Sequence, residues 1–206
     1  MKKKIIQIIS ILFIFLIGFI IHNLYEWFPN IVTLILSPVN ESVFEHMKMI
    51  YTSYIIWIIV KYFILKKYNI KENNFLLKEL LTLLFNIALF LTIYWPIYSK
   101  FGENMLVTLT IYLVTIIISQ ILNYFIEFKK DSNVLNIISL IVIFLIYAFT
   151  TYLTYNPPIC KLFLDPTNNS YGLNKWVSSK YFNIFIYIYI YFSFFNYFYK
   201  PKTIYN

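Results

Sequence analysis

The feature that most constrains this chain is a series of apolar runs, each long enough to cross a lipid bilayer. A membrane-spanning helix needs roughly 20 predominantly apolar residues, because it rises only about 1.5 Å per residue. By this rule the sequence predicts six transmembrane helices, at residues 5–25, 43–65, 76–98, 105–127, 134–154 and 181–199. The last run alternates as strands do, but its length and the need to satisfy backbone groups inside a bilayer favour a helix. We therefore expect an all-α bundle that forms a single integral membrane domain over residues 1–206.

The composition and the placement of the lysines predict the lipid bilayer as a partner and no nucleic acid. Hydrophobic residues make up 60% of the chain and charged residues only 13%. The formal net charge of +8 comes from lysines clustered between the apolar runs, not spread along one soluble face. With a cytoplasmic amino terminus, twelve lysines fall on the cytoplasmic side and five outside, which agrees with the positive-inside rule. We expect a multi-pass protein with both termini in the cytoplasm.

Three shorter features complete the predicted organisation. Residues 29–38 have a proline near each end and an apolar middle too short to cross, which predicts a short interfacial or re-entrant segment between the first two helices. The apolar run after the first lysines is longer than a typical signal peptide and lacks a small-residue cleavage pattern, so we expect an uncleaved first span. The only cysteine, Cys160, excludes an internal disulfide and a metal site built from several thiolates. Its role is not predicted.

The side chains that carry site chemistry concentrate in residues 22–48. Both histidines, His22 and His46, and three of the nine acidic residues lie there. His22 and Glu26 are four residues apart and therefore share one face of a helix, and two further glutamates repeat that spacing. The predicted topology brings these groups to the outer membrane interface, together with an aspartate from the last outer loop.

This cluster predicts metal-assisted hydrolysis of a lipid or envelope substrate. Two histidines and one carboxylate with an open fourth position are a ligand set of catalytic zinc sites. A bound divalent metal such as zinc would lower the pKa of its water to about 7, leaving a spare glutamate as general base. The predicted metal ligands are His22, His46 and Glu26, the catalytic residues are Glu41 and Glu45, and the ligand pocket is lined by Glu26, Asn40 and Asp165.

Two other interpretations stay open. The cluster can be a structural collar of an accessory membrane protein, in which Ser42 and Glu45 form a capping box at the start of the second helix. A small-solute transporter or channel would draw on polar stripes, although such stripes are typical of hydrogen bonds between helices. The stripes are Thr108, Tyr112, Thr115, Ser119 and Asn123 in the fourth predicted helix, and Glu79, Thr82 and Asn86 in the third. Ion coupling would require ionisable residues near the bilayer midplane, where the predicted helices place none.

One segment carries a family resemblance. The run from Ser37 to Ser42, S-P-V-N-E-S, with Glu45-His46 after it, is its most specific part, joined by residues 22–27, Phe163 to Pro166 and Tyr171-Gly172. Together these resemble an uncharacterised family of integral membrane proteins of about 200 residues from clostridia and related low-GC bacteria. The resemblance covers essentially the whole chain. It implies a bacterial plasma-membrane location and brings no known activity with it.

Overall fold

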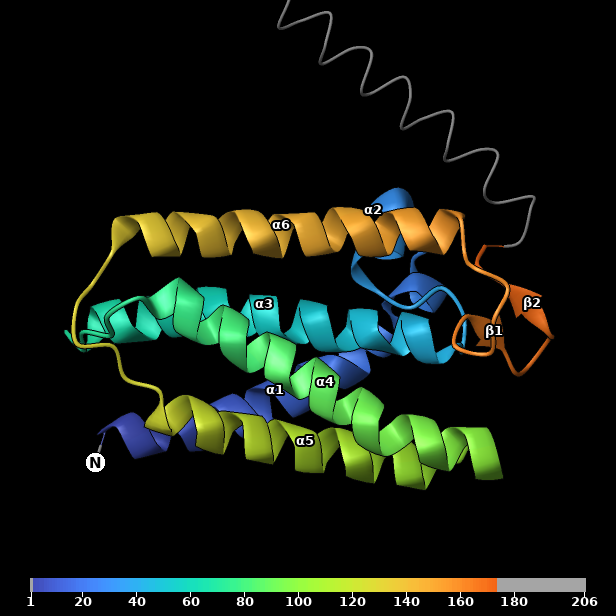
Figure 1. The fold of residues 1–206 in the computed structure, drawn as a ribbon, viewed down its shortest axis with the longest axis horizontal. Coiled ribbons are helices and arrows are strands. Elements are labelled where there is room, and N and C mark those ends of the chain that lie inside the picture. The colour runs from blue at the N-terminus through green and yellow to red at the C-terminus, as the bar shows by residue number, and fades with distance from the viewer. Residues whose placement is uncertain (1, 174–206) are drawn as a thin grey trace, which may run out of the picture. The chain divides into compact units, whose positions relative to one another are not determined.

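The computed structural model describes residues 2–173, and the predicted transmembrane helix at 181–199 lies outside them. The described elements are α1 (Lys2–Trp27), α2 (Ile31–Leu36), α3 (Val43–Lys67), α4 (Phe75–Phe101), α5 (Met105–Phe125), α6 (Asn133–Tyr155), β1 (Leu164–Asp165) and β2 (Ser170–Tyr171) (Figure 1). Every long helix begins and ends within three residues of its predicted bounds. Among the described residues, five helices are long and apolar enough to cross a membrane. The all-helical fold is thus confirmed, with five candidate membrane spans among the described residues, and the count of six spans stays a prediction.

Successive long helices run in opposite directions, so their ends gather at two ends of the bundle (Figure 1). We call one of these the histidine end, because His22 and His46 lie there. It contains the end of α1, the start of α3, and all of α2, β1 and β2. We call the opposite one the lysine end. It contains the starts of α1 and α4 and the ends of α3 and α5, with Lys3 and Lys71 among its residues.

The α3 helix forms the centre of the bundle. It packs against α1 and α4, and α5 packs against the same two helices. Its side chains Tyr54 and Trp57 are fully buried. Large apolar side chains on the outer faces, such as Leu12 and Phe144, are instead exposed. Since apolar surface is stable against lipid, this distribution fits a bundle that contacts a bilayer.

Polar side chains join α4 to α5 along one buried seam. The Asn123 amide donates to Glu79 Oε1 at 3.0 Å and to Thr82 Oγ1 at 2.8 Å. The Asn86 amide donates to Ser119 Oγ at 3.1 Å. All five side chains are fully buried. The two predicted stripes therefore face each other and are joined by interhelical hydrogen bonds, as such stripes usually are.

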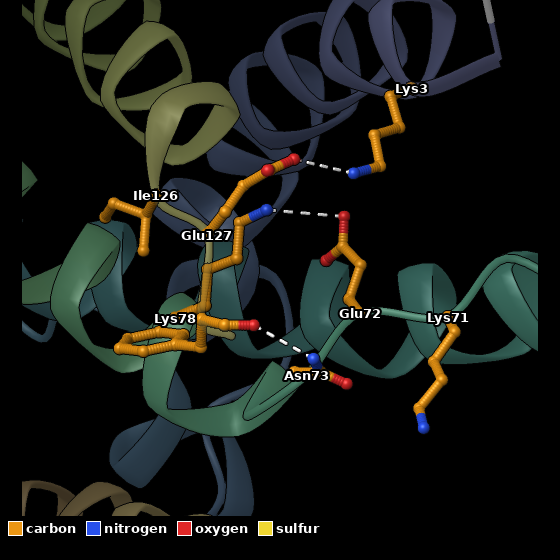
Figure 2. Close-up of a pocket in the computed structure, with 8 residues that line it drawn as sticks. Lys3, Lys71, Glu72, Asn73, Lys78, Ile126 and Glu127 are labelled. Atoms are coloured by element: carbon orange, nitrogen blue, oxygen red, sulfur yellow. Dashed lines mark hydrogen bonds and ion pairs between the residues drawn. The ribbon is translucent and has the colours of Figure 1, made fainter. Parts of the chain in front are cut away.

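A buried ion network holds the lysine end together. Lys61 Nζ lies 2.7 Å from Glu79 Oε1 and 3.3 Å from Glu72 Oε2. Lys78 Nζ lies 3.3 Å from the other oxygen of Glu72, and Figure 2 shows these two side chains facing each other. Lys61 and Glu79 are fully buried. The network links α3, α4 and the loop between them, and it was not predicted, because Lys61 was counted only as one of the twelve cytoplasmic lysines.

The segment before α3 folds as the short helix α2. Asn30 caps it, because its side-chain oxygen accepts from the backbone N–H groups of Val32 and Thr33. From α3, Lys48 Nζ donates to the Leu34 carbonyl at 2.8 Å, which holds α2 against the bundle. A short helical segment is thus present where one was expected, and its depth in a bilayer remains a prediction.

The loop after α6 closes over the start of α3. Its β1–β2 hairpin contains Asn169 and is followed by Gly172, both with positive φ, as expected of a turn-rich loop. The backbone N–H of Phe44 donates to the Leu162 carbonyl at 3.0 Å, and the Phe44 and Phe163 rings stack with centroids 4.3 Å apart. This contact fixes the first turn of α3, which carries His46.

Candidate metal centre

Three segments bring His22, Glu41 and His46 together at the histidine end. His22 lies near the end of α1, His46 lies in the first turn of α3, and Glu41 precedes α3. The start of α3 is fixed by two local caps: Ser42 Oγ accepts from the Glu45 N–H at 3.3 Å, and Asn40 Oδ1 accepts from the Ser42 N–H at 2.9 Å. These bonds leave the Glu41 side chain free to turn toward the histidines.

The three ligand atoms form a nearly equilateral triangle. The two histidine Nε2 atoms are 3.2 Å apart, and Glu41 Oε2 lies 3.6 Å from His22 Nε2 and 3.4 Å from His46 Nε2. In a tetrahedral zinc site with bonds of about 2.0–2.1 Å, neighbouring ligand atoms are about 3.3 Å apart. The triangle therefore has the dimensions of one face of such a site. Among the described residues, no other group of three or more histidine, cysteine or acidic side chains has its ligand atoms close enough together to hold a metal ion.

The hydrogen bonding of His46 sets the tautomer that a metal requires. Its Nδ1 lies 2.9 Å from the Ser42 carbonyl oxygen, which can only accept, so Nδ1 carries the hydrogen. In the neutral ring Nε2 then has its lone pair directed at the triangle. A ring nitrogen fixed by a backbone carbonyl is the usual support of a metal-bound histidine.

The electrostatics of the centre favour a cation. A hydrogen bond with His22, together with electrostatic interaction with the two histidine rings, lowers the pKa of the Glu41 carboxyl despite its partial burial. Glu41 is therefore an anion at neutral pH. His46 is buried, whereas about a third of the Glu41 side chain is exposed, so the triangle is closed on the protein side and open toward its surroundings. An open side leaves room for water or substrate at a fourth position.

A fourth acidic residue shares this environment. Glu103 lies in the short loop between α4 and α5, and its carboxyl interacts electrostatically with His46, Glu41 and His22. Partial burial raises the pKa of Glu103, and the neighbouring Glu41 carboxylate raises it further. Glu103 was not predicted from the sequence, because a single acid in the three-residue connection between α4 and α5 carries no spacing signal. Only the packing of α4 and α5 against α1 and α3 brings it to the histidine end.

Glu45, predicted as catalytic, lies in a different buried network. Its Oε2 is 2.8 Å from Lys48 Nζ, and its Oε1 accepts from Thr154 Oγ1 of α6 at 2.7 Å. Lys48 also donates to Thr154 Oγ1 at 3.1 Å. Both Glu45 and Lys48 are buried. Glu45 directly precedes His46 in the first turn of α3, but its carboxylate makes these contacts with Lys48 and Thr154, which join α3 to α6.

The three predicted pocket residues are not among the ligand atoms of the triangle. Asn40 donates from its amide to the Gly172 carbonyl at 3.0 Å, so it ties the hairpin loop to the segment before α3. Asp165 is buried and accepts from the backbone N–H and hydroxyl of Thr167, which stabilises the hairpin turn. Glu26 is exposed at the end of α1 and does not belong to the group of ligand atoms. The structure thus unites the two predicted histidines with Glu41 in place of Glu26.

Comparison with known proteins agrees with the family resemblance seen in the sequence. No curated protein and no solved structure is significantly similar to the chain. The model of a family of unknown function (DUF6512) matches residues 1–173, which includes α1 to α6, the triangle and the hairpin loop. The chain therefore belongs to the DUF6512 family, a family of unknown function.

Proposed function

We propose that this protein binds a divalent transition metal, such as zinc, through His22, Glu41 and His46 and uses it to hydrolyse a lipid or another envelope substrate. The observation that supports this most directly is the triangle of ligand atoms, with edges of 3.2, 3.4 and 3.6 Å. Two imidazoles and one carboxylate with an open fourth position are typical of catalytic zinc rather than structural zinc.

The reaction needs a proton acceptor next to the metal, and Glu103 is the best-placed candidate. A bound metal would supply a water whose pKa is lowered to about 7. The raised pKa of Glu103 brings its carboxyl closer to neutral, where an acid or base transfers protons most effectively. Glu103 would accept the proton of the attacking water and return it to the leaving group. Glu41 takes the role of metal ligand in this arrangement.

The surroundings of the triangle favour a substrate that comes from the membrane. Large apolar side chains are exposed around the histidine end, at the helix ends that border the triangle. They are Trp27, Phe28, Phe101, Met105 and Ile159. A tryptophan at a helix end, as Trp27 is, is typical of the membrane interface, and exposed apolar side chains beside it are stable against lipid. A lipid or lipid-linked ester could therefore reach the open side of the triangle without leaving the bilayer.

Metal analysis of the purified full-length protein tests this proposal. We expect about one zinc per chain in the wild type and in Glu26→Gln, and loss of the metal in His46→Ala and in Glu41→Gln. Glu41→Gln is informative because this partly exposed side chain supports no other described contact than the histidines, so the fold should persist. Metal in both ligand variants, or none in the wild type, would contradict the assignment.

A second variant separates catalysis from binding. Glu103→Gln should retain the zinc and lose at least 100-fold in the rate of fatty-acid release from phosphatidylglycerol, since general base catalysis typically contributes that much. If the wild type holds the metal but shows no lipase or phosphatase activity, the metal-binding assignment stands and the hydrolase assignment is wrong.

The lysine distribution supports an orientation in which the histidine end faces outward across the plasma membrane. Cys160 offers a direct test, because it is the only cysteine of the chain and is exposed in the loop after α6 at the histidine end. A maleimide that cannot cross membranes should label Cys160 in intact cells as fully as in lysed cells. Labelling only after lysis would show that the histidine end faces the cytoplasm.

A further inference from the structure

A groove runs between α1 and α5 at the lysine end. Its surface is almost wholly apolar, its volume is about 320 Å³, and it opens toward the surroundings of the bundle. Its lining residues are Lys4, Gln7, Ile8, Ile11, Gln120, Ile121, Tyr124 and Phe125. Ile8 and Ile121 are more than half exposed. In a bilayer such a groove has the shape and chemistry of a site for an acyl chain, and it ends at the amine-bearing Lys4.

A polar pocket is lined by residues that are next in sequence to the groove residues of α1 and α5. Its volume is about 160 Å³, and its lining includes Lys3 and Lys78 with Glu72 and Glu127. Lys3 is the neighbour of Lys4, and the pocket residues Ile126 and Glu127 follow the groove residue Phe125. Figure 2 shows the amines of Lys3 and Lys78 directed into this opening and Lys71 directed away from it.

Four lysines line the two cavities, and two of them, Lys4 and Lys71, form no ion pair with the described residues; Lys71 is the one directed away from the opening (Figure 2). Lys3 pairs with Glu127 at 2.8 Å, and Lys78 pairs with Glu72 at 3.3 Å. An amphiphile with one negative charge next to its acyl chains complements this arrangement, because lysines near the membrane surface attract anionic lipids.

We infer that the groove and the pocket together bind an anionic phospholipid. One acyl chain lies along α1 and α5, and the phosphate lies at Lys4 with Lys3 beside it. Glu127 competes with the phosphate for Lys3. This site lies at the opposite end of the bundle from His22 and His46, so it does not depend on the proposed metal centre.

Binding of two lipids with identical acyl chains tests the charge part of the inference. Native mass spectrometry of the full-length protein in detergent would compare dioleoyl phosphatidylglycerol with dioleoyl phosphatidylcholine. We expect phosphatidylglycerol to bind at least fivefold more tightly, and Lys4→Gln to remove about fivefold of that preference. Glu127→Gln should instead increase it, since it frees Lys3. The matched control is Lys66→Gln, which removes an exposed lysine of the same end that lines neither cavity.

Blocking the groove tests the acyl-chain part. Ile121→Trp should weaken the binding of both lipids, whereas Ile118→Trp, on the same helix but outside the groove, should leave it unchanged. Competition by glycerol 1-phosphate without weakening by Ile121→Trp would show a phosphate site and overturn the lipid assignment. Equal affinity for both lipids, or an equal loss in Lys4→Gln and Lys66→Gln, would also overturn it.

Discussion

The two ends of the bundle both gather ionisable side chains, but they combine them in different ways. At the lysine end each buried carboxylate faces a lysine: Lys61 lies between Glu72 and Glu79, and Lys78 pairs with Glu72. At the histidine end, two imidazole nitrogens and one carboxylate oxygen face one another. In an ion pair the opposite charges neutralise each other. Three atoms that face one another with their lone pairs instead repel, unless a proton or a metal ion lies between them. The first arrangement indicates a structural role and the second a binding role.

The strongest test of this difference removes one charge from the lysine end. Lys61→Met should lower the free energy of unfolding by about 3–5 kcal/mol, because it leaves Glu79 buried without its partner. Unfolding in mixed detergent micelles with increasing dodecyl sulfate measures this loss. Lys66→Met, on the exposed face of the same helix, is the control and should change little. A loss below 1 kcal/mol for Lys61→Met would show that the ion network does not stabilise the fold.

The next largest effect is expected at the histidine end, and it depends on the metal. Zinc at 100 times its dissociation constant should stabilise the wild type by about 2.7 kcal/mol, because it binds the folded state alone. His46→Ala should gain no such stabilisation. The same unfolding assay, with and without zinc, gives both values. Equal stabilisation of the two proteins would place the metal elsewhere.

A smaller effect separates Glu45 from the metal centre. Thr154→Val removes the hydroxyl that donates to Glu45 Oε1 and accepts from Lys48, so it should cost about 1–3 kcal/mol of stability. The zinc content should be unchanged, because Glu45 serves the contact between α3 and α6. Loss of zinc in Thr154→Val would instead show that this network and the centre are coupled.

The smallest effect concerns an exposed carboxylate of the lysine end. The backbone N–H of Asn74 donates to Asp131 and lowers the pKa of its carboxyl. A carboxyl with a lower pKa in the folded state stabilises the protein above its unfolded pKa of about 3.9, and this contribution is lost as the pH falls through the folded value. Asp131→Asn should therefore melt slightly lower than the wild type at pH 7, and this difference should shrink as the pH falls below about 3.9. If the difference in melting temperature between the two proteins stays the same in acid, the Asp131 carboxylate is not its cause.

Much of the fold could be predicted because it depends on local patterns. The length of apolar runs set the bounds of five helices, and the spacing of Glu79, Thr82 and Asn86 placed them on one face, where they contact α5. Ser42 was expected to cap α3, and it does. Only half of the expected capping box forms, since the Ser42 N–H bonds to Asn40 and the Glu45 carboxylate turns to Lys48.

The candidate site was harder to predict because it depends on how separate segments meet. The spacing of His22 and Glu26 is correct for one helix face, but Glu26 lies one turn closer to the end of α1 and is exposed. Glu41 replaces it because α2 and the caps at Asn40 and Ser42 turn the chain back toward α1. Nothing in the local sequence specifies that turn. Glu103 was missed because it depends on the packing of distant helices, and the partners of Lys61 were missed because they depend on how the loop after α3 and the start of α4 fold back onto α3.

The position of the three ligands along the chain has a consequence for how the protein is assembled. His22, Glu41 and His46 all belong to the first 46 residues, and only α1, α2 and the first turn of α3 are needed to bring them together. The ion network of the lysine end can form only after α4 has been synthesised, and its contact with Asn123 only after α5. Contacts between segments close in sequence form before distant ones. If the proposed site holds a metal, that metal can bind the nascent chain as soon as α1, α2 and the first turn of α3 have formed, before the later helices pack against them.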